Sequence, residues 1–85
     1  WVNVDIQRLM GEIERLATFS DAPAPAVTRV LYTPTDLAAR AYLKSLFAEA
    51  DLELREDALG NLFARWVGAE PDLPAVGTGS HTDAI

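Results

Sequence analysis

Apolar residues recur at helical spacing near the start of the chain. One face of a helix would carry Ile6, Leu9, Met10, Ile13, Leu16 and Ala17, with most polar residues on the other faces. Asn3 or Asp5 can cap this helix, because a side-chain oxygen there accepts a hydrogen bond from a free amide of the first turn. The segment from Ser20 to Pro25 contains two prolines, and these end the helix.

A second helix is predicted from Pro34 to Ala50. Thr33 precedes a proline that suits the first helical position, and Asp36 places an acid in the first turn, where the helix dipole favours it. Its predicted buried face consists of Ala39, Leu43, Leu46, Phe47 and Ala50.

The period then changes from helical to alternating. Leu52 and Leu54 alternate with polar neighbours and indicate a half-buried strand, which a turn over 57–61 and a returning strand over 62–67 extend to a hairpin. Gly60 and Asn61 both tolerate the positive φ that such a turn needs. The segment 74–80 is predicted to be a third strand, and its glycines favour an internal position with close backbone neighbours.

This order predicts an α/β fold, with two amino-terminal helices followed by a hairpin and a glycine-rich internal strand. Both helices are expected to pack against a sheet that contains Leu54, Phe63 and Val76. We expect that sheet to continue with strands beyond Ile85, so that residues 1–85 form the amino-terminal part of one domain, truncated at its carboxyl end. The chain alone would then expose an unpaired strand edge and an uncovered apolar face.

Composition adds several exclusions. The 85 residues are 49% hydrophobic and 24% charged, which is typical of a globular protein. The absence of cysteine and the single histidine exclude a disulfide scaffold and a self-contained zinc finger. The net charge of −6, with dispersed basic residues, disfavours nucleic acid and anionic membranes as partners. No signal peptide or membrane span is visible, and we expect a cytoplasmic protein.

Candidate chemistry is confined to one segment, Gly79-Ser80-His81-Thr82-Asp83. In extended backbone, residues two apart point to the same side, so His81 and Asp83 converge. A carboxylate beside an imidazole fixes the tautomer that a metal-ligating histidine needs. Taken alone, His-x-Asp is more typical of an ordinary surface or core histidine, and one histidine cannot hold a divalent ion. The acid-rich stretch from Glu49 to Asp57 is interpreted as a solvated face rather than a metal site.

Four ordered motifs together resemble a known family. They are Ala26-Val27-Thr28-Arg29, Pro34-Thr35-Asp36-Leu37-Ala38-Ala39-Arg40, the stretch Asp57-Ala58-Leu59-Gly60-Asn61-Leu62-Phe63-Ala64-Arg65, and Gly79-Ser80-His81-Thr82-Asp83-Ala84-Ile85. The chain resembles the start of amidohydrolases that act on ureidoglycolate, allantoate or N-carbamoyl-L-amino acids, within the dinuclear-metal aminoacylase and carboxypeptidase superfamily. Ala84-Ile85 stands where typical members carry Thr-Val, and this is most similar to the ureidoglycolate branch.

The resemblance implies that the chain is part of a larger mixed-sheet metallohydrolase catalytic domain. His81 would be a metal ligand, and Asp83 would orient its imidazole and count as catalytic. Two divalent ions, Mn or Zn, would serve the parent enzyme, while the fragment alone would hold no stable metal site and be inactive. The parent is expected to be a homodimer that hydrolyses a small ureide or N-carbamoyl substrate, with ureidoglycolate favoured.

Two alternatives remain at this stage. Within the same class, the substrate could be an N-carbamoyl-L-amino acid or allantoate, since substrate choice depends on residues beyond Ile85. From a different class, the chain could be a small non-catalytic helix-and-hairpin interaction domain.

Overall fold

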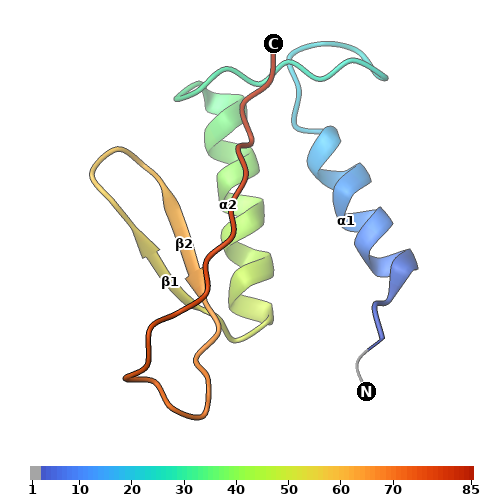
Figure 1. The fold of residues 1–85 in the computed structure, drawn as a ribbon. Coiled ribbons are helices and arrows are strands. Elements are labelled where there is room, and N and C mark those ends of the chain that lie inside the picture. Colours follow the sequence, from blue (N-terminus) through green and yellow to red (C-terminus); the bar gives the residue numbers. More distant parts are fainter. Residues whose placement is uncertain (1–2) are drawn as a thin grey trace. The chain divides into compact units, whose positions relative to one another are not determined.

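The computed structural model describes residues 3–85, in which two helices precede one antiparallel hairpin (Figure 1). Helix α1 spans Ile6–Ala17 and helix α2 spans Pro34–Glu49. Strands β1 (Glu53–Glu56) and β2 (Leu62–Arg65) form the hairpin. The predicted order of these four elements is confirmed. Within this part of the chain, no helix combines the length and the apolar character needed to cross a membrane.

The chain divides into two compact units. One unit comprises the residues up to Arg40 together with His81–Ile85, and the other comprises Ala41–Ser80. The first unit therefore combines α1 and the start of α2 with the last residues of the chain, whereas the second contains the hairpin and the long loop after it.

The start of α1 is set by Asp5, one of the two predicted caps. Its carboxylate accepts a hydrogen bond from the backbone amide of Arg8 at 3.1 Å. The helix ends at Ala17, ahead of the two prolines, and Thr18 follows as its C-cap. The loop that follows is ordered by Ser20, whose hydroxyl accepts from the amides of Ala22 and Thr28.

The start of α2 is held by two reciprocal hydrogen bonds. The Thr33 hydroxyl accepts from the Asp36 amide at 3.3 Å, and the Asp36 carboxylate accepts from the Tyr32 amide at 3.0 Å. Asp36 is completely buried, and its contact fixes Tyr32 at a φ of 67°, in the left-handed region. The predicted start at Pro34 is confirmed.

The end of α2 falls one residue before the predicted end. Asp51, with a φ of 56°, takes the left-handed position that glycine usually occupies after a helix. The amide of Leu52 then donates to the Phe47 carbonyl at 3.0 Å, and the Asp51 amide donates to the Ala48 carbonyl at 3.0 Å. These two bonds satisfy carbonyls that the last turn leaves open, so the chain leaves the helix and enters β1 directly.

The hairpin turn depends on Asp57. Its carboxylate accepts from the amides of Leu59 and Asn61 and from the side-chain amide of Asn61, at 2.8–3.0 Å. Gly60 has a φ of 90°, as the sequence predicted for this turn. The hydrogen bond from the Asn61 side chain is the largest of the effects that lower the pKa of Asp57 below its ordinary value.

The predicted third strand is not formed. Residues 74–80 are irregular and exposed, and no described strand pairs with them. Backbone in extended form needs a hydrogen-bonded neighbour, and Gly77 and Gly79 bring no side chain that could pack in its place. The prediction of a third strand is therefore wrong for residues 74–80 of this chain, while its internal position in a sheet that continues beyond Ile85 stays a prediction.

The apolar face of α1 is largely uncovered, as expected of the chain alone, and its burial against a sheet that continues beyond Ile85 stays a prediction. Four residues of the α1 stripe are between 41% and 60% exposed: Ile6, Leu9, Met10 and Ile13. Leu54 and Phe63 are each 43% exposed, Val76 is fully exposed, and Ala50 lies on the surface. Ala39 is the one apolar residue that is buried within the described part of the chain. A two-stranded hairpin offers too little surface to cover such faces.

Candidate active site

The last residues of the chain run beside a segment far away in the sequence. The Arg29 amide donates to the Ala84 carbonyl at 2.8 Å, and the Ala84 amide donates to the Arg29 carbonyl at 2.9 Å. This reciprocal pair is one antiparallel bridge, and it holds the backbone around Asp83 in extended form.

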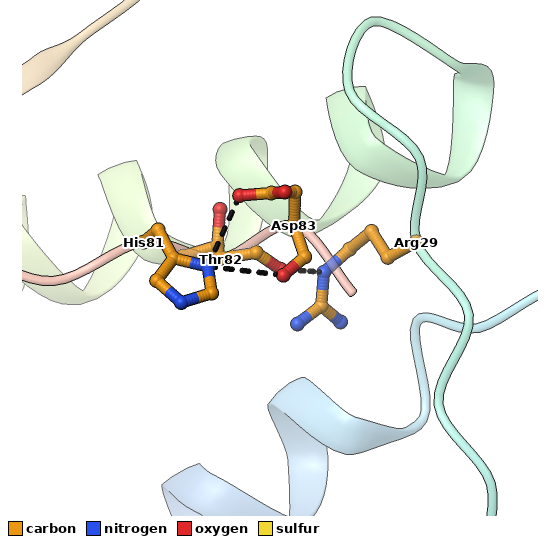
Figure 2. A network of polar contacts seen from close by, with 4 residues as sticks. All are labelled: Arg29, His81, Thr82 and Asp83. Atoms are coloured by element: carbon orange, nitrogen blue, oxygen red, sulfur yellow. Dashed lines mark hydrogen bonds and ion pairs between the residues drawn. The ribbon is translucent and has the colours of Figure 1, made fainter. Parts of the chain in front are cut away.

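Extended backbone places His81 and Asp83 on the same side of the chain, as predicted. Figure 2 shows the two side chains facing each other, with Nδ1 of His81 lying 3.1 Å from Oδ1 of Asp83 and 3.1 Å from the Asp83 carbonyl oxygen. Both partners are acceptors, which assigns the ring hydrogen to Nδ1. The lone pair of the neutral ring then lies on Nε2, which points away from Asp83 (Figure 2).

The same segment receives a buried cation. Arg29 is 5% exposed, and its Nε donates to the Thr82 carbonyl at 2.9 Å (Figure 2). Its Nη1 donates to the carbonyls of Leu16 and Phe19 at the end of α1, at 2.9 and 2.8 Å. The motif Ala26-Val27-Thr28-Arg29 predicts no role for Arg29. The one signal was a single charged residue within the otherwise uncharged run from Ala26 to Leu31.

Metal-ligating groups do not gather elsewhere in the part of the chain that the structure describes. Among residues 3–85, no set of three or more histidine or acidic side chains is placed to hold a metal ion. In the acid-rich stretch, Glu56 pairs with Lys44 at 2.8 Å and Asp57 is engaged in the hairpin turn. The chemistry that this chain presents is therefore one imidazole nitrogen, oriented by one carboxylate.

Comparison with known proteins finds similarity to a class of amidohydrolases. The chain is 47% identical over 79 residues to N-carbamoyl-L-amino-acid amidohydrolase from Paenarthrobacter aurescens, covering 93% of this chain and 19% of that protein. It is 39% identical over 70 residues to allantoate amidohydrolase from Escherichia coli, covering 82% of this chain and 17% of that protein. No family model matches the chain.

Within that class the similarity is greater to ureidoglycolate hydrolase. The Arabidopsis thaliana enzyme is 58% identical over 84 residues, which are 99% of this chain and 18% of that protein. The crystal structure of AtUAH in complex with glyoxylate superposes with a TM-score of 0.94, covering 99% of this chain and 20% of that one. The chain is thus homologous to ureidoglycolate hydrolase, as the motifs indicated, and spans about a fifth of the length of the relatives it matches.

Proposed function

We propose that this chain is the amino-terminal part of the catalytic domain of a metal-dependent amidohydrolase that hydrolyses a ureide C–N bond, with ureidoglycolate as substrate. The observation that carries the proposal is the His81–Asp83 pair at 3.1 Å, in a chain 58% identical to ureidoglycolate hydrolase. The exposed apolar faces of α1 and the hairpin support a larger domain that covers them.

The pair fits one position of a metal site. A neutral imidazole binds a metal through the nitrogen that carries no hydrogen, and the carboxylate on the other nitrogen fixes that tautomer. His81 would ligate through Nε2 while Asp83 holds the ring. The remaining ligands and the general base would come from residues outside this chain, since the described residues provide no further ligand set.

Two divalent ions, Mn or Zn, are the proposed cofactors. When bound, such ions lower the pKa of a water molecule and polarise the scissile carbonyl. The contribution of this chain is to present one ligand in a fixed orientation.

The ligands bound in the similar structures favour ureidoglycolate as the substrate. Cleavage of the carbamoyl C–N bond of ureidoglycolate by water gives hydroxyglycine and carbamate, and the carbamate decomposes to ammonia and carbon dioxide. Loss of ammonia from hydroxyglycine leaves glyoxylate. Two structures of AtUAH contain glyoxylate and (S)-hydroxyglycine respectively, and both are 58% identical to this chain over a match that covers 20% of their length. These ligands are the organic products expected of such a reaction.

An N-carbamoyl-L-amino acid is the second candidate substrate, favoured by the 47% identity to the Paenarthrobacter enzyme. Its scissile bond is the same carbamoyl C–N bond, so the same pair would serve both reactions.

We further propose a cytoplasmic homodimer that uses neither nucleic acid nor membrane as a partner, in keeping with the net charge of −6.

The test uses the complete enzyme of which we propose this chain is a part. Purified with Mn²⁺, it should hydrolyse ureidoglycolate with a higher kcat/KM than allantoate or N-carbamoyl-L-amino acids, measured by ammonia release. His81→Ala should remove one metal equivalent and most of the activity, while Thr78→Ala, in the exposed loop nearby, should match the wild type. Hydrolysis of none of these substrates, or full activity in His81→Ala, would contradict the proposal.

A further inference from the structure

Within residues 3–85, the orientation of the His81–Asp83 pair does not come from packing of the two side chains. The side chains of His81 and Asp83 are 80% and 52% exposed, so few neighbouring atoms restrict their rotamers. The 3.1 Å contact between them therefore depends on the backbone that carries both residues.

Arg29 holds that backbone on both sides of Asp83. Its side chain donates to the Thr82 carbonyl at 2.9 Å (Figure 2). Its main chain exchanges two hydrogen bonds with Ala84. Residues 82 and 84 are thereby fixed by a single residue 53 positions earlier in the chain than Thr82. With both neighbours fixed, the residue between them retains little backbone freedom.

Arg29 is itself anchored. Its Nη1 donates to the Leu16 and Phe19 carbonyls, at the end of α1 where the helix dipole is negative. A buried cation is costly unless its donors are satisfied, and three carbonyl contacts with little exposure meet that condition. The guanidinium is thus a rigid link from the end of α1 to the segment that carries His81.

We propose that Arg29 is a positioning residue for the His81–Asp83 pair, acting through the Thr82 carbonyl and the Ala84 bridge. The proposal rests on the proposed function, in which His81 ligates a metal ion. Arg29 contacts neither the imidazole nor the carboxylate, so its effect is exerted entirely through the backbone. A purely structural Arg29 would instead hold the end of α1 and leave the metal site unchanged in every molecule that folds.

The test compares Arg29→Met, Arg29→Lys and Arg15→Met in the complete enzyme. Methionine retains the apolar length of the side chain and removes its donors, whereas lysine retains the charge and a single donor nitrogen. Arg15 is the matched control, because it lies in the last turn of α1 and stacks on Phe19 at 5.3 Å.

Three readouts are needed for each variant: Mn²⁺ affinity by competition with a chelator, amide hydrogen exchange in the peptide 79–85 without metal, and kcat at saturating metal. Arg29→Met should weaken Mn²⁺ binding about 10-fold, at the low end of the range for residues that support metal ligands, and speed exchange in 79–85. Arg29→Lys should lie between Arg29→Met and the wild type, and Arg15→Met should match the wild type.

A folded Arg29→Met with wild-type Mn²⁺ affinity and wild-type exchange would overturn the proposal. If Arg29→Met does not fold, Arg29→Lys decides in the same way, and wild-type values in that variant would overturn the proposal.

The proposed function and the positioning role of Arg29 can be refuted separately. An enzyme that binds Mn²⁺, depends on Arg29 and hydrolyses no ureide refutes the substrate alone. An active enzyme whose Arg29 variants match the wild type refutes the positioning role alone.

Discussion

Replacing Asp83 by asparagine tests the site most directly, because the change preserves shape and removes charge. The carboxylate accepts a hydrogen bond from Nδ1 of His81 at 3.1 Å. A hydrogen bond to a charged group contributes about 1 kcal/mol more than a neutral one, which corresponds to roughly a 5-fold change in an equilibrium or a rate. The 52% exposure of Asp83 gives no reason to expect more from this term alone.

A second effect acts through the tautomer. The asparagine side chain can turn its amide nitrogen toward Nδ1, and the ring hydrogen would then move to Nε2, the nitrogen proposed as the ligand. Supporting residues of metal ligands typically contribute about 10- to 100-fold in affinity or activity. We therefore expect Asp83→Asn in the complete enzyme to retain metal and to lose between about 5- and 100-fold in kcat.

The assay is steady-state ureidoglycolate hydrolysis with metal content measured on the same samples. Asp72→Asn is the matched control, because it removes one acid from an exposed loop without touching the pair. Turnover by Asp83→Asn at the wild-type rate would refute the orienting role.

Three further predictions concern the 85-residue chain on its own. It should bind Mn²⁺ or Zn²⁺ no better than millimolar in isothermal titration, since one imidazole and one carboxylate leave most coordination positions to water, and a stoichiometric micromolar site would contradict this. It should sediment as oligomers or precipitate, because the stripe carrying Leu9 and Ile13 is exposed, and a monodisperse monomer with a cooperative thermal transition would favour the interaction domain. The hairpin should lose stability as the pH falls below 3.8, the ordinary pKa of Asp57, because a pKa that is lower in the folded state means that the ionised form stabilises the fold. Chemical shifts of the hairpin followed by NMR should show this acid transition, and Asp57→Asn should remove it.

Elements whose determinants are local could be predicted from the sequence. The cap Asp5 lies within one helical turn of the backbone amide from which it accepts a hydrogen bond. At the start of α2, the Thr33 hydroxyl accepts from the Asp36 amide, and the Asp36 carboxylate accepts from the amide just before Thr33. The hairpin turn is equally local, because Asp57 and Asn61 close it between themselves. Each of these contacts depends on spacing along the chain alone, and spacing is what a sequence displays.

The strand predicted over 74–80 needs a distant partner and is not formed. Val76 and the glycines around it have the composition of a buried strand, yet this segment is irregular because no described strand pairs with it. The helical stripe of Ile6 and Ile13 likewise indicates which face is apolar without indicating what covers it. A hydrophobic pattern shows which side chains can be buried. Whether they are buried depends on other residues that supply a surface to pack against.

The candidate site combines both kinds of determinant. The convergence of His81 and Asp83 follows from the two-residue period of extended backbone and is visible in the sequence. What keeps that backbone extended is Arg29, whose carbonyl and amide partners carry no sequence signature because every residue has them. Thr82 and Ala84 would bond Arg29 equally well with other side chains. The residue types therefore indicate the chemistry of the pair, whereas its orientation depends on backbone contacts that are visible only in the folded structure.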